Sequence, residues 1–162
     1  AAALQGSFSD MTIKNEEDII MTPVKLIRRA KEAMQHAYTP YSNFKVGAAL
    51  LTAEGKVYLG CNIENAAYSP SNCAERTAFF KAVYEGERNF TAIAVVGGRN
   101  GVIEDIFPPC GVCRQVMQEF CGPNFMIYMG RSDDSYVAVR LEDFLPYGFS
   151  AGKYMKETQK TE

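Results

Sequence analysis

The sequence predicts an α/β protein, a three-layer α/β/α sandwich around a mixed sheet of five strands. Segments with helical spacing of apolar residues alternate with short apolar or β-branched runs, in the order helix, strand, strand, helix, strand, helix, strand, strand. The chain has 162 residues, of which 47% are hydrophobic and 22% charged. These values are typical of one globular domain with a full hydrophobic core.

The first predicted elements are a helix and a β-hairpin. Thr22 followed by proline is typical of a helix N-terminus, and the apolar residues that follow recur at helical spacing, so a helix is expected over about 22–37. The apolar run 45–52 and the run 57–61 have the composition of strands. The Ala-Glu-Gly-Lys sequence between them is typical of a turn and predicts the hairpin.

The rest of the chain alternates helices with strands. A loop rich in Asn, Ser and Pro precedes a helix that starts at a cysteine, and a second cysteine starts the next helix after a Pro-Pro pair. The strands on either side of this second helix should be parallel neighbours, because the helix forms a crossover between them. The expected segments are a loop at 62–72, helices at 73–84 and 110–120, strands at 91–97, 125–129 and 136–140, and a short helix at 141–145.

The domain boundaries are expected near residues 21 and 150. Residues 1–20 are interpreted as a lead segment that is disordered or was added to the natural chain, residues 21–150 as a single domain, and residues 151–162 as a polar C-terminal tail. No apolar run approaches the roughly 20 residues needed to cross a bilayer. The first ten residues also lack the basic start and apolar stretch of a secretion signal.

The charge of the chain bears on its partners. Lys and Arg number 17 and Asp and Glu 19, a formal net charge of -2, and the longest basic cluster is the short one around Arg28. Nucleic acids and anionic membranes are bound by extended basic surfaces. We therefore expect neither a nucleic acid nor a membrane as partner, and expect a small molecule as substrate.

Five cysteines, Cys61, Cys73, Cys110, Cys113 and Cys121, are the residues most suited to chemistry. An odd number in a chain without a recognisable signal argues against a disulfide framework and for reduced thiols, so some of them are expected to be metal ligands or catalysts. The same reasoning predicts a cytoplasmic protein, and its small size is compatible with access to the nucleus.

The spacing of three of these cysteines favours a zinc site. Cys110 and Cys113 alone fit a redox pair, half of a zinc site or two core thiols equally well. Cys73 changes this balance, because it also stands at the predicted start of a helix. Three thiolate ligands leave the fourth tetrahedral position of zinc open for water, which is the catalytic arrangement, whereas a fourth ligand from Cys61 or Cys121 would make the site closed and structural.

Two charged residues beside Cys73 fit a catalytic zinc site. Glu75 follows a ligand by two positions, so its carboxylate can lie near the metal without binding it and can move protons. Such a Glu together with a Pro-Cys-x-x-Cys sequence is the signature of zinc deaminases. Arg76 can offset the negative charge of three thiolates. The alternatives are a solvent-exposed carboxylate for Glu75 and a surface salt bridge for Arg76.

Longer stretches around these residues closely resemble one family. Over almost all of residues 22–150 the chain is similar to the small, homotetrameric cytidine deaminases of pyrimidine salvage, in the version with three cysteine ligands. The Asn-Ile-Glu-Asn sequence separates this family from other zinc deaminases. The matching stretches are Pro40–Leu50, Gly60–Tyr68, Cys73–Ala78 and Pro109–Gln115.

The resemblance implies an activity and an assembly. It implies zinc-dependent hydrolysis of cytidine and deoxycytidine to uridine, deoxyuridine and ammonia, with one Zn²⁺ per subunit held by Cys73, Cys110 and Cys113. Glu75 would carry the proton from the attacking water to the substrate. It further implies a homotetramer whose active sites lie at subunit interfaces.

The resemblance also implies the residues that bind the substrate. Asn62 and Glu64 correspond to the residues that hold the ribose hydroxyls, and a carboxylate at this position would repel a 5′-phosphate. Phe44 corresponds to an aromatic residue near the base, and Ala74 is a further expected substrate-binding residue. Tyr68 and Phe149 correspond to residues supplied across a subunit interface. For Phe44 and Phe149 the alternative is ordinary packing.

Three other functions are compatible with part of the pattern. A deaminase of the same fold could act on another aminopyrimidine, such as a nucleoside antibiotic, but Asn62 and Glu64 argue for a ribose. A nucleic-acid-editing or RNA-binding protein would need a basic face. A structural zinc module would leave Glu75 unexplained. His36, the only histidine, is expected to have no role.

Overall fold

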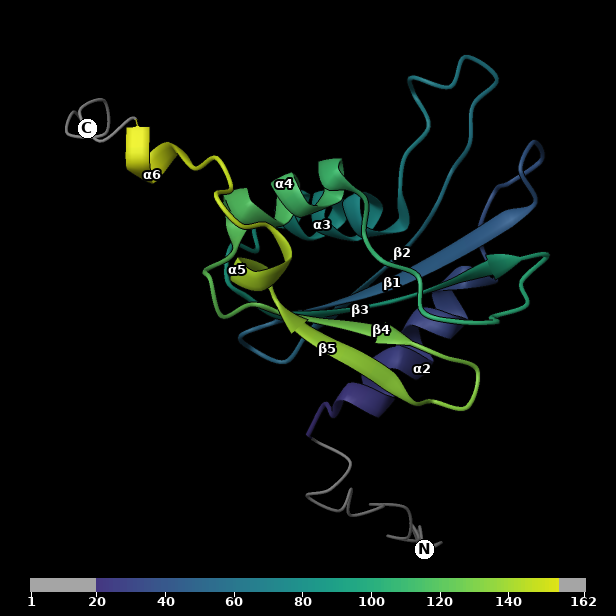
Figure 1. The fold of residues 1–162 in the computed structure, drawn as a ribbon, viewed down its shortest axis with the longest axis horizontal. Coiled ribbons are helices and arrows are strands. Elements are labelled where there is room, and N and C mark those ends of the chain that lie inside the picture. Colours follow the sequence, from purple (N-terminus) through teal and green to yellow (C-terminus); the bar gives the residue numbers. More distant parts are fainter. Residues whose placement is uncertain (1–19, 155–162) are drawn as a thin grey trace, which may run out of the picture.

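A computed structural model describes residues 20–154 as a three-layer α/β/α sandwich, which confirms the predicted fold class (Figure 1). The five strands form one sheet in the order β2-β1-β3-β4-β5. The pair β3 and β4 is parallel, and the other neighbours are antiparallel. The strands are β1 Phe44–Thr52, β2 Val57–Cys61, β3 Phe90–Arg99, β4 Met126–Gly130 and β5 Tyr136–Arg140.

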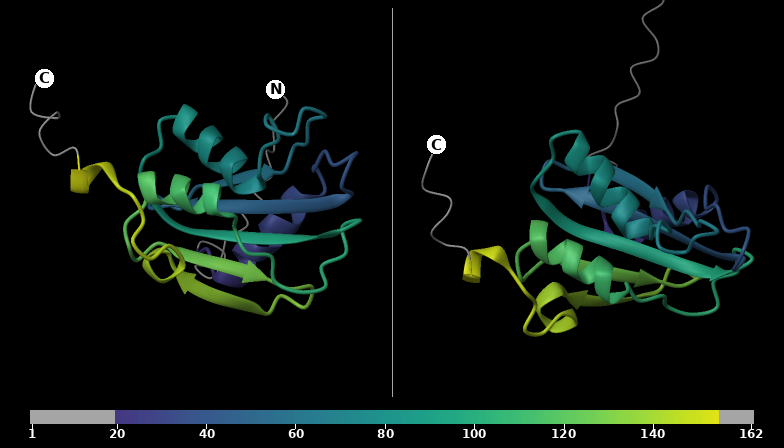
Figure 2. Two further views of the ribbon diagram at one scale, coloured as in Figure 1. Left: turned by 45° about the horizontal axis from the view of Figure 1, so that its top comes forward. Right: turned by 90° about the horizontal axis from the view of Figure 1, so that it is seen from above.

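Helices cover both faces of this sheet. Figure 2 shows α2 on one face and α3 and α4 side by side on the other, and each face has its own apolar core. Along β1, Ala48 and Leu50 face α3 and α4, whereas Ala49 faces α2, so the strand is buried on both sides. The helices are α2 Pro23–Met34, α3 Ala74–Tyr84, α4 Gly111–Phe120, α5 Leu141–Phe144 and α6 Ala151–Tyr154.

The start of α2 agrees with the prediction, but its end does not. The Thr22 side chain accepts a hydrogen bond from the backbone N–H of Lys25 at 3.3 Å, as an N-cap does. The prediction of a helix to residue 37 was wrong, because the helix ends at Met34. The following N–H groups, including that of His36, bond to carbonyls three residues earlier and tighten the last turn.

The remaining boundaries differ from the expected ones by a few residues. The hairpin of β1 and β2 and the parallel pair β3 and β4 are both present. Strand β3 is longer than predicted at both ends, and the short helix α6 lies within the segment expected to be a polar tail. The lead segment predicted for residues 1–20 lies outside the described residues except for its last residue, and so do tail residues 155–162.

A glycine in β2 sets the distance between the sheet and α3. A Cβ atom at Gly60 would lie 2.2 Å from the carbonyl oxygen of Ala74 and 2.5 Å from the backbone nitrogen of Ala78. Any side chain at this position would therefore push α3 away from the sheet. The close contact fixes the first turn of α3, which carries the residues discussed below.

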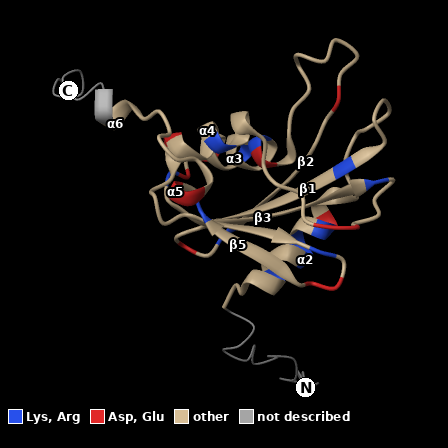
Figure 3. Ribbon diagram, in the orientation of Figure 1, with Lys and Arg blue, Asp and Glu red and all other residues tan. Residues whose placement is uncertain are grey.

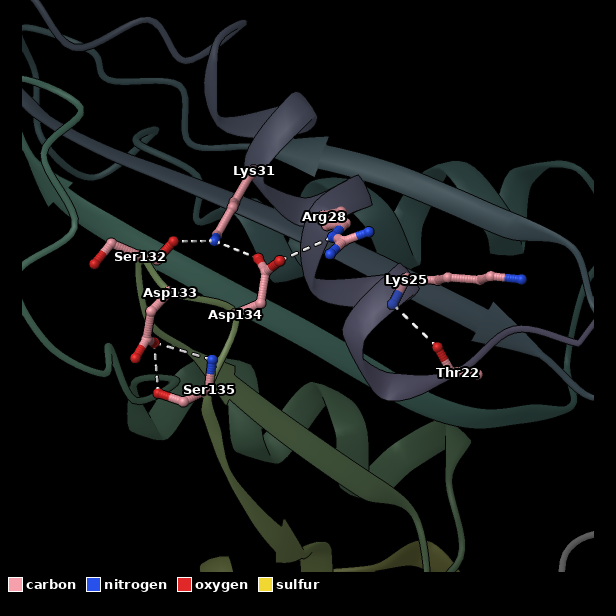
Figure 4. A network of polar contacts seen from close by, with 8 residues as sticks. All are labelled: Thr22, Lys25, Arg28, Lys31, Ser132, Asp133, Asp134 and Ser135. Carbon is pink, nitrogen blue, oxygen red and sulfur yellow. Dashed lines mark hydrogen bonds and ion pairs between the residues drawn. The ribbon is translucent and has the colours of Figure 1, made fainter. Parts of the chain in front are cut away.

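Ion pairs connect α2 to the turn between β4 and β5 (Figure 4). Asp134 accepts from Lys31 Nζ at 2.6 Å and from Arg28 Nε at 2.8 Å. Lys31 also donates to the carbonyl of Ser132 at 2.8 Å. Both Lys31 and Asp134 are mostly shielded from solvent, so this pair is screened less than an exposed one.

Replacing Asp134 with Asn should lower the free energy of unfolding at pH 7 by about 1 kcal/mol, because the charged partner of two cations is lost. Lys31 and Arg28 hold the pKa of Asp134 below its ordinary value. The stabilisation is therefore complete above the unfolded-state pKa and disappears as the pH falls through the folded-state pKa. Urea unfolding of the wild type and the variant at neutral and acidic pH measures the difference in free energy of unfolding. A difference that persists at a pH where Asp134 is protonated in both the folded and the unfolded state would contradict the electrostatic cause. Glu142→Gln, which removes a carboxylate from an exposed pair with Arg140, serves as control.

Charged residues of both signs are interspersed over the elements (Figure 3). Within the described part of the chain, no helix is long and apolar enough to span a membrane.

Candidate active site

Three cysteines from two helix starts meet at one point. Helices α3 and α4 begin at the same end of their layer (Figures 1 and 2), and Cys73 and Cys110 are their N-cap residues. Both caps have extended backbone, and neither thiol makes a capping hydrogen bond. Cys113 lies in the first turn of α4 and is buried. The partial positive charges of two helix N-termini thus face the same three sulfur atoms.

The spacing of the three sulfur atoms fits zinc. The Sγ atoms of Cys73 and Cys110 lie 3.9 Å apart, those of Cys110 and Cys113 lie 3.6 Å apart, and all three lie within 4.8 Å of one another. Tetrahedral zinc with zinc–sulfur bonds of about 2.3 Å places its sulfur ligands about 3.8 Å apart. The thiols can therefore hold one zinc ion per subunit with little movement.

The other two cysteines lie apart from this group. The potential metal-binding group found among residues 20–154 consists of Cys73, Cys110 and Cys113 and includes no fourth side chain. The Cys61 thiol instead donates to the carbonyl of His36 at 3.3 Å. Burial raises the pKa of Cys121 to about 12, which keeps it a neutral thiol. A closed four-cysteine site is therefore not what the geometry favours.

Arg76 lies against the thiol group. Its guanidinium donates to Cys73 Sγ at 3.6 Å and to the carbonyl of Ser71 at 3.4 Å. Its Nε is buried and has no hydrogen-bond partner among the described residues. The guanidinium stays charged and offsets the negative charge of thiolates. The predicted alternative, a surface salt bridge, does not appear among the ion pairs of residues 20–154.

The neighbours of Cys73 favour its thiolate form. Hydrogen bonds from the Cys113 thiol and from the Arg76 guanidinium lower the pKa of Cys73 to about 5. The pKa of Cys113 is raised, because its proton is shared with Cys73 and the side chain is buried. Cys73 is thus prepared to bind a cation as a thiolate at neutral pH.

Glu75 is a buried carboxyl group beside the thiols. Its side chain is 2% exposed, although it lies in the first turn of α3, where carboxylates are usually solvated. Burial raises the pKa of Glu75 to about 7. A carboxyl group that gains and loses a proton near neutral pH suits general acid–base catalysis. The alternative of a solvent-exposed carboxylate is wrong.

A cavity of about 390 Å³ extends from these residues to the surface. Its lining includes Cys73, Cys110 and Glu75 together with the polar residues Ser42, Asn62 and Glu64. The volume suits a small ligand. The sides are mainly apolar and are formed in part by Phe44, Val46, Ala74, Phe107 and Pro108.

Asn62 both lines the cavity and extends the sheet. Its Oδ1 accepts from the backbone N–H of Val46 at 2.8 Å, and its Nδ2 donates to the carbonyl of Phe44 at 2.8 Å. An amide oxygen has two lone pairs and an amide nitrogen two protons, so each atom keeps one hydrogen-bonding position. The Asn62 side chain can therefore bind a ligand while it makes these two hydrogen bonds to the first residues of β1.

Glu64 is held in place by the loop before β1. One carboxylate oxygen accepts from the backbone N–H groups of Tyr41 at 3.0 Å and Ser42 at 3.2 Å, and the other accepts from the Ser42 hydroxyl. These bonds, above all the one from the hydroxyl, lower the pKa of Glu64. The side chain is thus an oriented carboxylate with acceptor capacity left for a hydroxyl group.

Comparison with known proteins agrees with this geometry. The family model described as the cytidine and deoxycytidylate deaminase zinc-binding region matches residues 21–129. The cytidine deaminase of Sporosarcina psychrophila is 50% identical over 126 residues, 78% of this chain and 90% of the relative. The chain belongs to the cytidine and deoxycytidylate deaminase family. The cytidine deaminase of Halalkalibacterium halodurans is 48% identical over 78% of this chain and 92% of the relative.

Solved structures of cytidine deaminases share the fold. The cytidine deaminase from Burkholderia pseudomallei matches with a TM-score of 0.74 and 48% identity, over 80% of this chain and 100% of that chain. The enzyme from Mycobacterium tuberculosis matches with a TM-score of 0.65 and 38% identity, over 76% of this chain and 94% of that chain. The family is a zinc-binding one, in agreement with the three-cysteine group of this deaminase.

The aromatic residues of the deaminase cavity were only partly predicted. Phe44 lines the cavity as expected, and Ala74 is buried at its edge. Phe107 was missed, although it precedes Cys110 by three positions in a loop that the sequence left without structure. Tyr68 also lines the cavity, is 78% exposed and has a φ of 54°, a conformation rare for a large side chain. Phe149 does not line the cavity of its own chain.

Proposed function

We propose that this chain catalyses the hydrolytic deamination of cytidine and deoxycytidine to uridine and deoxyuridine. The observation that carries the proposal is the position of Glu75, buried beside three convergent thiols in a cavity whose lining also offers an amide and a carboxylate. The reaction consumes one water and releases ammonia. The membership of the chain in the deaminase family supports the same reaction.

The residues around the three thiols would perform the proton transfers. Cys73, Cys110 and Cys113 would hold the zinc ion, which would supply Lewis acidity and make a water more acidic. Glu75 would accept one proton from the attacking water and donate it to N3 of the base while the water oxygen adds to C4. It would then accept the second proton of that oxygen and donate it to the amine, so that the bond from C4 to the amine nitrogen breaks and ammonia leaves. Arg76 balances the charge of the thiolates. A carboxyl group with a pKa of about 7 can act in both directions without a large energetic penalty.

Two polar residues of the cavity lining, Asn62 and Glu64, would bind the sugar. Glu64 would accept hydrogen bonds from ribose hydroxyls, and Asn62 would add a donor and an acceptor. The carboxylate of Glu64 would repel a 5′-phosphate, so the substrate is a nucleoside and not a nucleotide. Phe44 and Ala74 would contact the base.

The assembly belongs to the same proposal. Phe149, which is 56% exposed, and Tyr68, which is 78% exposed although it also lines the cavity of its own chain, would each contribute to the active site of a neighbouring subunit in a homotetramer. Residues 21–150 would form a single catalytic domain. Reduced zinc-binding thiols fit a cytoplasmic enzyme, and the product uridine fits a role in pyrimidine salvage.

The first experiment is the ultraviolet absorbance change of cytidine incubated with the purified protein. We expect conversion to uridine, with release of ammonia in equal amount. A sample from which zinc has been removed with a chelator should be inactive, and added zinc should restore the activity, because the three thiols hold the metal that the reaction requires.

Two results would contradict the proposed function. A folded, zinc-loaded protein that leaves cytidine and deoxycytidine unchanged would mean that the site serves another aminopyrimidine, and the sugar-binding roles of Asn62 and Glu64 would be the first to abandon. Full activity in protein shown by metal analysis to contain no zinc would contradict the role of the three cysteines.

A further inference from the structure

Two phenylalanine rings form one wall of the cavity. The ring centroids of Phe44 and Phe107 lie 4.9 Å apart with an interplanar angle of 38°, and both residues line the cavity. Phe44 begins β1, whereas Phe107 belongs to the loop between β3 and α4. The pair therefore joins two segments that are distant in the sequence, and neither ring is an isolated surface residue.

The rings occupy space that a glycine leaves free. A Cβ atom at Gly97 would lie 3.0 Å from Cγ of Phe107 and 3.2 Å from Cε1 of Phe44. These distances are shorter than ordinary carbon–carbon contacts. The absence of a side chain at Gly97 thus lets both rings pack directly against the backbone of β3.

The segments that carry the rings are tied together. The backbone N–H of Asn100 donates to the carbonyl of Asn43 at 2.7 Å, next to Phe44. Arg99 donates to the carbonyl of Ser42 at 3.3 Å. On the other side of the loop, Asp105 pairs with Arg131 at 2.9 Å. These bonds connect the loop that carries Phe107 to neighbouring segments, and the contact between the rings places Phe107 against Phe44.

The position of Phe107 indicates which edge of a bound base its ring faces. This inference about the bound base rests on the proposed function. In that reaction C4 lies at the thiol group and N3 faces Glu75, which comes from the start of α3. The segment 107–110, on the α4 side of the cavity, leads directly to a thiol ligand. The edge of the pyrimidine opposite N3, formed by C5 and C6, is then directed to this segment.

We propose that Phe107 contacts the C5–C6 edge of the base and limits the size of the substituent at C5. The Phe107 ring packs against Phe44 and lies close to the backbone of Gly97, so it has little room to move away from a larger base. An aromatic ring also offers a large apolar contact to an unsubstituted pyrimidine.

The test compares Phe107→Ala and Phe107→Leu with the wild type on cytidine and 5-methylcytidine. For Phe107→Ala we expect kcat/KM for cytidine to fall about tenfold, mainly through KM, because a contact to the ring is lost. We expect the ratio of kcat/KM for 5-methylcytidine to that for cytidine to rise about tenfold, because space is created at C5. Phe107→Leu should show a smaller change in this ratio.

A second readout does not require turnover. Equilibrium binding of uridine and 5-methyluridine should show the same shift in preference in Phe107→Ala. If the wild type fails to convert cytidine but the binding preference shifts, the proposed function fails and the role of Phe107 stands.

The matched control is Phe120→Ala. Phe120 packs in the same core but does not line the cavity. Its variant should therefore leave unchanged both the kcat/KM ratio of 5-methylcytidine to cytidine and the binding preference between 5-methyluridine and uridine. Metal analysis and thermal unfolding check that each variant is folded and loaded with zinc. If Phe107→Ala changes stability but leaves the kcat/KM ratio and the binding preference at their wild-type values, Phe107 only packs against Phe44, and the proposal is overturned.

Discussion

Replacing Glu75 with Gln should leave zinc bound and lower kcat for cytidine by about a thousandfold or more. The variant keeps the size of the side chain and the three thiols, so the metal site is unchanged. The amide cannot accept a proton from water and deliver it to N3 or to the leaving amine, and a general acid–base group contributes about 10²–10⁴-fold. Steady-state kinetics and metal analysis of the same preparation measure both properties.

The control for this variant is Glu119→Gln, on the exposed part of α4. It removes the same charge from the chain but lies outside the cavity lining, and it should turn over cytidine like the wild type. A Glu75→Gln enzyme with a rate close to that of the wild type would show that another group moves the protons, and the assignment of Glu75 would be abandoned.

Replacing Cys113 with Ala should remove both zinc and activity. Cys113 is buried and contributes one of three thiols, and two remaining thiols cannot form the zinc site described here. We expect the zinc content after desalting to fall from about one per chain to less than about a tenth, with kcat/KM for cytidine below detection. Inductively coupled plasma spectrometry gives the metal content.

Cys121→Ala is the matched control, because Cys121 is partly buried at the end of α4 but lies outside the three-thiol group. It should retain zinc and activity. If Cys113→Ala keeps a full equivalent of zinc, the ligand set is wrong. Circular dichroism of both variants separates loss of metal from loss of the fold.

The fold was predictable because local sequence signals and tertiary packing agree. The Thr22 cap, the turn between β1 and β2, and the cysteine at the start of α3 all lie where the sequence indicated. The end of α2 was not predictable from periodicity, because the apolar spacing continues to Ala37 after the backbone has left the helix. There the chain turns so that Tyr38 can pair with Ile63, a contact between distant residues.

The candidate site was predictable where its residues belong to a motif and less so elsewhere. The thiols and Glu75 stand at fixed spacings in two helix starts, so chemistry alone indicates them. Phe107 stands at no such spacing, and its place depends on its contact with Phe44 and on the space that Gly97 leaves free. The hydrogen bonds of Asn62 to β1 were also not foreseeable, because they depend on the register of the sheet.

The cysteine caps of α3 and α4 link metal binding to local order. The first N–H groups of a helix often bond to the side chain of the N-cap residue. In α3 and α4 the N-cap side chains of Cys73 and Cys110 make no such bond. A metal that binds both caps joins the two helix starts and favours their ordered form. Because local opening of either first turn must break the same coordination, metal affinity and the protection of these amides from exchange are governed by one equilibrium.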